Sequence, residues 1–341
     1  MPVHLRAIGR SVPATRYTQD ALYAHRPWQE TPLLHRLFFD SPIQSRALAV
    51  EPSFYRSPRT LDETNARWRA AALGLGGAAL RGALHSAGLD PIQIDLLAVT
   101  TVTGYATPGL DLLLAHQEGL RSTIQRTHFN NVGCHAAIPL LRTAVDHVAQ
   151  RPGAVGVALA VEVCSACFSP DDDVQNIVAI SLFADGAAAA VVSTTGDGPI
   201  VVDFESAFDF ENLDALAFDL TPHGFRIVLD PKVPHAIGRG VEAVVGRLLD
   251  RNGVTRDRVS TWAFHPGGAR ILDEVAAALG LDEHTMRHSR RVLRGYGNMS
   301  SPSVLFVLSE ALRDAPPAPG TFGVLAAFGP GLGIECCLLS F

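Results

Sequence analysis

The sequence predicts an α/β protein, and three observations support this class. Helical and strand-like apolar patterns alternate along the whole chain, as in folds that cover a sheet with helices. The 341 residues, of which 47% are hydrophobic and 18% charged, are enough to bury a large core. No low-complexity linker interrupts the alternation. We therefore expect two halves, residues 1–195 and 196–341, that share one core.

Apolar periodicity and stop signals predict the elements of the first half. Residues 65–89 form an alanine-rich helical pattern that stops at Gly88-Leu-Asp-Pro91. Short apolar runs then predict buried strands, and helical spacing predicts the helices between them. In chain order these are a strand at 94–102, a helix at 110–118, a strand at 126–132, a helix at 134–149, a strand at 156–163, and a turn leading into a small-residue strand within 181–192.

The second half echoes this order of elements without repeating the sequence. Its predicted elements are a strand at 200–204, a helix at 234–251, a strand that ends at His265, a helix at 268–279, a helix after Ser301, and closing strands at 323–328 and 333–339. The echo predicts a structural pseudo-repeat of two related halves.

Composition argues against several classes of function. The net charge of −6 argues against a nucleic-acid partner, because phosphate binding needs a basic surface. The chain shows no apolar run of about 18 residues and no basic-then-apolar leader, so we expect no membrane partner and a cytoplasmic location. Five cysteines, an odd number, fit reduced thiols. Cys164 and Cys167 have C-x-x-C spacing, but no second pair stands at metal-ligand spacing, so we predict buried thiols and no metal.

Three residues indicate the chemistry. Cys134 follows Gly133 at the junction of a strand and a helix, where the helix N-terminus and a neighbouring imidazolium would lower the pKa of the thiol. His265 ends a strand before Pro-Gly-Gly, and Asn298 lies in a glycine-rich loop. Alone, each has an ordinary explanation as a buried thiol, a core or surface histidine, or a turn residue. Together they supply a nucleophile, an acid–base group and an amide donor for acyl transfer from a thioester.

Papain-like cysteine proteases also place a cysteine, a histidine and an asparagine in this order. Their cysteine lies near the mature N-terminus in a Cys-Gly-Ser-Cys-Trp-like context. Cys134 instead follows a long α/β pattern and lacks those neighbours. The sequence therefore favours another family.

Six separated motifs carry a closer resemblance. They are Thr103-Gly-Tyr-Ala-Thr-Pro-Gly109, Gly133-Cys134, Leu182-Phe-Ala-Asp-Gly-Ala-Ala188, Trp262-Ala-Phe-His-Pro-Gly-Gly268, Tyr296-Gly-Asn-Met-Ser-Ser301 and Phe328-Gly-Pro-Gly-Leu332. With these motifs nearly the whole chain resembles the chalcone-synthase-like type III polyketide synthases of the thiolase superfamily. One departure is Ala327, which replaces the first glycine of the family's Gly-Phe-Gly-Pro-Gly-Leu loop.

The resemblance implies a thiolase-like fold with five αβαβα layers and a homodimer, in which Thr107 matches a residue that reaches across the interface. It implies that Cys134 holds an acyl group, while His265 and Asn298 stabilise the enolate of a second thioester. It further implies that Phe183 is an aromatic gatekeeper between an entrance tunnel and a cavity. Two more substrate-binding positions near that cavity are Glu162 and Ser300. This chemistry needs no cofactor.

Departures from the family pattern point to an apolar substrate. Ile227 stands where the family has a second gatekeeper phenylalanine, and a smaller residue widens the cavity if Phe225 does not refill it. Cys164 and Cys167 replace threonines of members that cyclise aromatic products. The loss of those hydroxyl groups favours an apolar pocket, and the wider cavity at Ile227 suits a long or branched acyl chain.

The entrance departs further. The family holds the phosphates of coenzyme A with lysines and arginines of an early helix, where this chain has Leu34, Leu37 and Ser41, with Arg36 or Arg46 as possible substitutes. Arg270 stands five residues after His265, where the family often has alanine near the tunnel mouth. Its guanidinium there suits one phosphate, and the alternative is an ordinary solvated helix residue. A phosphopantetheine arm on an acyl carrier protein has one phosphate.

This combination resembles stand-alone ketosynthases that join two carrier-bound β-ketoacyl chains into α-pyrones of the myxopyronin and corallopyronin type. That reaction is the leading hypothesis. An iterative type III synthase that uses a fatty acyl-CoA starter and malonyl-CoA is the main alternative. Ketoacyl-carrier-protein synthase III, whose His-Gln-Ala-Asn-type motif is absent, and a non-catalytic binding partner of a synthase complex are the others.

Overall fold

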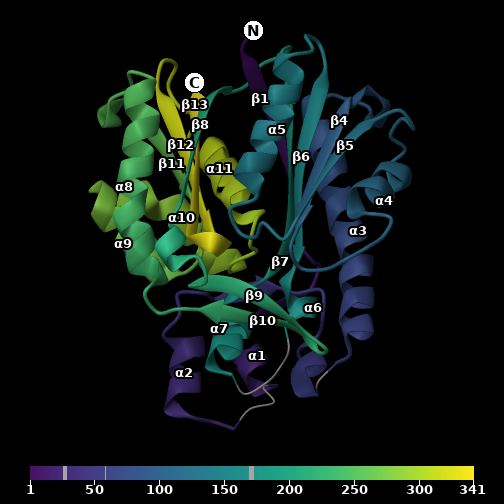
Figure 1. Cartoon of the computed structure of the whole chain (residues 1–341), viewed down its shortest axis with the longest axis vertical. Helices are drawn as coiled ribbons and strands as arrows, with labels where there is room; N and C mark the ends of the chain where they lie inside the picture. Colours follow the sequence, from purple (N-terminus) through teal and green to yellow (C-terminus); the bar gives the residue numbers. More distant parts are fainter. Residues whose placement is uncertain (26–28, 58, 169–172) are drawn as a thin grey trace.

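A large mixed β-sheet organises the chain (Figure 1). The computed structural model describes residues 1–25, 29–57, 59–168 and 173–341. In spatial order the strands of the sheet are β11 (Val259–Phe264), β12 (Phe322–Gly329), β13 (Gly333–Ser340), β8 (Ile200–Phe208), β1 (Val3–Ser11), β7 (Asp185–Ser193), β6 (Val155–Val163), β4 (Leu96–Thr101) and β5 (Gln125–Asn130).

The two halves repeat one strand arrangement. In the first half β4 pairs in parallel with β6, and β6, β7 and β1 follow in antiparallel pairs. In the second half β11 pairs in parallel with β12, and β12, β13 and β8 follow in antiparallel pairs. The halves join through a short pairing of β1 with β8. The predicted pseudo-repeat is therefore present in strand order.

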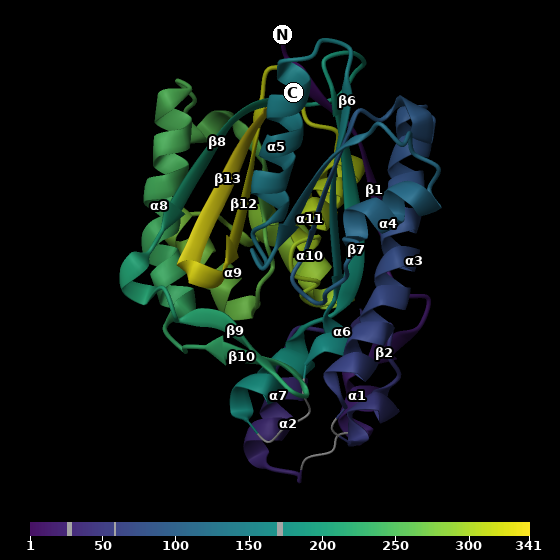
Figure 2. The ribbon, with the colours of Figure 1, turned by 45° about the vertical axis from the view of Figure 1, so that its right-hand side comes forward.

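Helices make five layers with the two arms of the sheet. The helices α5 (Ala137–Ala149) and α11 (Ser303–Asp314) contact strands of both arms and lie between them (Figure 2). The outer layers are α3 (Leu61–Ala87) on the first arm and α8 (Val233–Arg251) on the second. Strands β6 and β7, covered on both faces, are buried at every residue and consist largely of valine and alanine. This architecture confirms the predicted α/β class.

The long helix α3 shows how sequence sets these layers. A capping box between Thr60 and Glu63 begins it, and Gly88 in the left-handed conformation ends it. Gly9 of β1 lets this helix lie close, because a Cβ there would stand 2.1 Å from the carbonyl oxygen of Ala79. The helix therefore packs directly against the backbone of the sheet.

A cap of short elements covers one end of the sheet (Figure 1). The carboxyl ends of β4, β6, β11 and β12 point toward it. The cap and its connections contain α1 (Gln19–Ala24), α2 (Pro32–Phe39), α6 (Cys164–Cys167), α7 (Val174–Leu182), the pair β2 (Arg16–Thr18) and β3 (Ser45–Ala47), and the hairpin of β9 (Leu216–Thr221) and β10 (Gly224–Leu229).

The remaining elements connect or flank the layers. They are α4 (Leu110–Gln117), α9 (Ala269–Leu279), α10 (Glu283–Tyr296), and the 3₁₀ turns η1 (Pro52–Arg56), η2 (Pro91–Gln93), η3 (Phe210–Asn212), η4 (Arg256–Arg258) and η5 (Pro330–Leu332). Among the described residues, no helix combines the length and apolar character that crossing a membrane requires.

Candidate active site

A cavity of about 480 Å³ lies between the cap and the strand ends. The three predicted catalytic residues, Cys134, His265 and Asn298, all line it. They come from the loop after β5, the loop after β11 and the loop before α11. Residues far apart in the sequence therefore meet where parallel strands end, which is where α/β folds place their sites.

Cys134 lies in a tight turn ahead of α5. Gly133 has a φ of 90°, and a Cβ there would stand 2.5 Å from Pro330, so glycine is required on both counts. The amide of Ala136 donates to the carbonyl of Gly133, and regular helix starts only at Ala137. The predicted start of this helix at Cys134 was therefore wrong by three residues.

The Cys134 thiol is buried and accepts a hydrogen bond from the hydroxyl of Ser300, at 3.3 Å from Oγ to Sγ. Burial raises the pKa of the thiol to about 12, although the bond from Ser300 lowers it. Burial also lowers the pKa of His265 to about 3, helped by the neighbouring His135. The expectation of a low-pKa thiolate is thus corrected, because desolvation outweighs the stabilising contacts.

His265 follows the last residue of β11 and is almost completely buried. Its amide donates to the carbonyl of Ala326 at 2.8 Å, and its carbonyl accepts from the amide of Gly267. Its ring Nδ1 has no hydrogen-bond partner among the described residues. A neutral, unpartnered imidazole in the same cavity as the thiol can take the thiol proton at the moment of attack.

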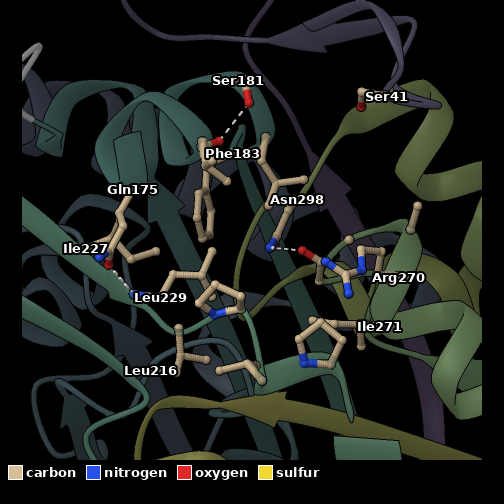
Figure 3. A pocket seen from close by; sticks show the side chains of 18 of the residues that line it. Ser41, Gln175, Ser181, Phe183, Leu216, Ile227, Leu229, Arg270, Ile271 and Asn298 are labelled. Carbon is tan, nitrogen blue, oxygen red and sulfur yellow. Dashed lines mark hydrogen bonds between the residues drawn. The ribbon is translucent and has the colours of Figure 1, made fainter. Parts of the chain in front are cut away.

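Asn298 is held from both its backbone and its side chain. Its backbone bridges to Phe183, and its Nδ2 donates to the carbonyl of Gly267 at 3.2 Å (Figure 3). Its Oδ1 accepts from the amide of Ser300 at 2.8 Å. Because a primary amide has two N–H groups, one remains for a substrate oxygen.

The side chain of Glu162 lines neither the large cavity nor the small inner void next to it. Ser301 donates to its Oε1 at 2.6 Å. Its Oε2 accepts from the amide of Val102 and the hydroxyls of Thr103 and Thr101. Burial nevertheless raises the pKa of this carboxyl to about 7. Glu162 is therefore placed to act on Cys134 through charge, and it does not line the cavity near which its substrate-binding role was predicted.

Phe183 caps the end of α7 and borders two spaces. One is the large cavity, and the other is a void of only about 10 Å³. The predicted gatekeeper thus lies between two compartments. The void is lined by Cys164, Cys167 and Ser300 together with the rings of Phe168, Phe218 and Phe225.

Ile227 faces the large cavity, so its smaller side chain leaves space on that side (Figure 3). The predicted widening of the cavity depended on Phe225 not refilling the space. Phe225 does refill the inner compartment behind Phe183. Cys164 and Cys167 therefore contribute to a nearly filled space, not to an open pocket. All five cysteines are free and buried.

Charged residues mark the mouth. Arg36 and Asp40 near α2 and Arg270 in the first turn of α9 line the cavity and are exposed to solvent. Arg46 is buried and donates to the carbonyls of Ile180 and Phe183. The guanidinium of Arg46 therefore binds the end of α7. The prediction that Arg46 could replace a phosphate-binding residue was wrong.

Sequence reasoning missed the apolar wall of the cavity. Val178, Leu216, Leu229, Val233 and Ile237 line it from α7, β9, β10 and α8. Nothing in their local sequence distinguishes them from ordinary core residues. Only the folded chain brings them together.

Comparisons with known proteins agree with this geometry. The N-terminal domain of chalcone and stilbene synthases matches residues 48–196, and the C-terminal domain matches residues 207–341. A 3,5-dihydroxyphenylacetyl-CoA synthase from Amycolatopsis balhimycina is 34% identical over 98% of this chain and 92% of its own length. The alpha-pyrone synthesis polyketide synthase-like Pks18 from Mycobacterium tuberculosis is 31% identical over 88% of this chain and 80% of its own.

Solved structures lead to the same family. The crystal structure of 1,3,6,8-tetrahydroxynaphthalene synthase from Streptomyces coelicolor A3(2), a bacterial type III polyketide synthase, superposes with a TM-score of 0.93. It is 28% identical, and the match covers 99% of each chain.

Proposed function

This chain belongs to the chalcone and stilbene synthase family and is a type III polyketide synthase, an acyltransferase; from that premise we propose that it joins two β-ketoacyl thioesters into an α-pyrone. The observation that carries the proposal is the single cavity that unites Cys134, His265 and Asn298 with a largely apolar wall. The N-terminal half, residues 1–195, supplies the nucleophile. The C-terminal half, residues 196–341, supplies the other two groups.

The first step loads an acyl chain. His265 accepts the thiol proton as Sγ of Cys134 attacks the carbonyl carbon of the first thioester. A new carbon–sulfur bond forms to Cys134, and the bond to the donor thiol breaks. The departing thiolate takes the proton from His265. Starting from neutral partners avoids holding two charges in a desolvated site.

The second step forms a carbon–carbon bond. His265 removes a proton from the carbon between the two carbonyls of the second β-ketoacyl thioester. The free N–H of Asn298 donates to the developing enolate oxygen, a type of contact worth about 3 kcal/mol in comparable sites. The carbanion attacks the acyl carbonyl, the bond to Cys134 breaks, and the proton on His265 returns to the thiolate.

Ring closure then releases the product. The enol oxygen on the δ-carbon attacks the remaining thioester carbonyl and forms the lactone. The carrier thiol leaves with the enol proton, so atoms and charge balance without an oxidant or a metal. The product is a 4-hydroxy-2-pyrone with one acyl and one alkyl substituent.

The mouth supports delivery on an acyl carrier protein. Arg270 and Arg36 offer two guanidinium groups, and Asp40 offsets part of their charge. This suits the single phosphate of a phosphopantetheine arm better than the several phosphates of coenzyme A. As in the family resemblance, we expect a homodimer, with the exposed Thr107 at the interface.

A second candidate is an iterative synthase that extends a fatty acyl-CoA starter with malonyl-CoA. The name of the Amycolatopsis relative, which contains coenzyme A in its product, favours it. In this reaction carbon dioxide leaves the malonyl group, and the same enolate contacts apply.

Product analysis separates the two candidates. The purified protein would receive matched β-ketoacyl chains on a carrier protein or on coenzyme A, with product masses recorded over time. We expect the α-pyrone to form faster from the carrier, and Arg270→Ala to lower that rate about tenfold. Arg239→Ala, an exposed arginine outside the cavity, is the control. Faster use of coenzyme A thioesters, with growth only when malonyl-CoA is present, would favour the iterative synthase. Unchanged carrier-fed rates in Arg270→Ala would remove the phosphate contact.

A further inference from the structure

We propose that the acyl chain held on Cys134 lies against a wall formed by α7 and the β9–β10 hairpin, and that the space behind Phe183 receives neither chain nor product. The ligand of this site is a long saturated or weakly polar aliphatic chain. This inference rests on the proposed acyl transfer to Cys134. It does not depend on which thioester delivers the chain or on formation of a pyrone.

The wall is largely apolar. Val178 of α7, Leu216 of β9, and Ile227 and Leu229 of β10 line the cavity, and Ile237 of α8 continues the surface. In Figure 3 the labelled side chains of this wall lie to one side of Phe183 and Asn298. Burial of methylene groups against such a surface is the main source of affinity for an aliphatic chain.

Side-chain amides hold the wall in place. Among the described residues, β10 pairs with the strand β9 and makes one isolated bridge, from Phe225 to Phe168, so other backbone N–H groups on that side need partners. Asn176 of α7 accepts from the amide of Ile227 at 2.9 Å, and Gln175 accepts from the amide of Leu229 at 2.6 Å. Asn176 is fully buried. The wall is therefore preformed and does not need a substrate to assemble it.

The opposite side of the cavity suits a different ligand. Arg270, Ile271 and Ser41 lie across from the apolar wall in Figure 3, and the exposed Arg36 also lines the cavity. These groups can bind the phosphate and amides of the arm that brings the second thioester. The acyl chain already on Cys134 is then left with the apolar side.

The inner compartment is closed to a chain. Phe168 packs against Phe183 with ring centres 5.2 Å apart and against Phe218 at 6.0 Å, and Phe218 packs edge to face on Phe225 at 6.3 Å. The void left among these rings, about 10 Å³, is at the lower limit for a single water molecule. A chain or product therefore cannot extend past Phe183 into this compartment.

Self-acylation of Cys134 tests the location of the chain. Intact-protein mass spectrometry would follow loading from coenzyme A thioesters that range from acetyl to tetradecanoyl. For the wild type we expect the second-order rate constant to rise by up to about fourfold per methylene until the wall is covered, the equivalent of about 0.8 kcal/mol. Leu216→Trp should remove this rise, so that the rate constants for long chains fall toward the rate constant for acetyl.

Phe225→Leu is the matched variant on the other side of Phe183. It enlarges the inner void and should leave the dependence on chain length unchanged. A shift toward longer chains in Phe225→Leu, with none in Leu216→Trp, would overturn the proposal and place the chain in the inner compartment. Failure of the wild type to load any thioester would instead contradict the acyl-transfer function on which the proposal rests.

A crosslink in the wild-type protein makes the test independent of how the variants fold. A chain with a terminal diazirine would be loaded on Cys134, irradiated and mapped by peptide mass spectrometry. Label on residues 174–182 or 216–229 outside Phe218 and Phe225 supports the wall. Label on Phe168 or Phe225, which line the inner void and not the large cavity, contradicts it.

Discussion

The cavity joins two regions that are built in different ways. At the reactive end, Cys134, Asn298 and Ser300 are fixed by specific hydrogen bonds and by unusual backbone angles, such as the φ of 59° at Ser300. At the apolar wall, generic branched side chains present a surface without directional contacts to substrate. The difference indicates that geometry sets the reaction, while side-chain volume sets the range of chains. Substitutions at the reactive end should slow all substrates, and substitutions at the wall should act on long chains only.

The largest effect is expected at His265. His265→Ala removes the group that moves protons in both loading and condensation. We expect the rate of product formation to fall by about 10³-fold or more for short and long chains alike. Steady-state kinetics with two chain lengths checks this. A loss confined to long chains would assign His265 to chain binding and break the distinction between the two regions.

Asn298→Ala should separate the two chemical steps. The amide contacts the enolate, so condensation should slow by about 10²- to 10³-fold. Acylation of Cys134, in which no enolate forms, should continue at a rate within about threefold of wild type. Rapid quenching with intact-mass detection measures loading, and product analysis measures condensation. Equal losses in both steps would mean that Asn298 acts mainly by holding Gly267 and Ser300 in place.

Ile227→Phe tests the wall from the opposite direction. The larger ring fills space in the cavity that holds the nucleophile, and overpacking of this kind costs about 1 to 3 kcal/mol. We expect loading of tetradecanoyl thioester to fall about tenfold or more, with acetyl loading nearly unchanged. The ratio of the two rate constants is the measurement. A uniform decrease for both chains would show that position 227 affects the reactive end.

The smallest effect should come from Glu162→Gln. Above pH 7 the Glu162 carboxyl is ionised, and its negative charge raises the pKa of Cys134. The variant should therefore react several-fold faster with iodoacetamide at high pH, and the two proteins should converge below about pH 6, where the carboxyl is neutral. A difference that persists at low pH would point to altered packing.

The same carboxyl also affects stability, with a defined sign. Its folded pKa of about 7 lies above the ordinary value of 4.5. The stability it contributes is present below pH 4.5 and is lost as the pH rises to 7. The free energy of unfolding of wild type should thus fall relative to that of Glu162→Gln across this interval. Denaturant unfolding of both proteins at several pH values measures the difference.

The sequence predicted the fold and the reactive end because both leave local signals. Alternating periodicities located β4, α5, β6, α8, β11 and the closing strands, and glycine-framed turns marked the loops that hold Cys134, His265 and Asn298. Helix α10 and the β9–β10 hairpin were not predicted. In α10 the buried positions are Met286, His288, Ser289, Val292 and Leu293, so polar side chains obscure its apolar face.

The sequence could not predict the apolar wall or the pKa of the nucleophile. Both depend on which side chains meet in space. In sequence, Leu216 and Val178 resemble core residues elsewhere, and only the fold places them in the same cavity as Cys134. The burial that raises the pKa of Cys134 comes from several elements at once, and a local sequence signal such as the helix start does not reveal it.

Intact-protein mass spectrometry of wild type and Cys134→Ala, after exposure to the same β-ketoacyl chain on a carrier protein and on coenzyme A, tests the account most directly. The account predicts one added acyl group on the wild type, faster from the carrier, and none on Cys134→Ala. Equal acylation of both proteins, or an unmodified wild type with either thioester, would contradict the assignment of Cys134 as the group that holds the chain.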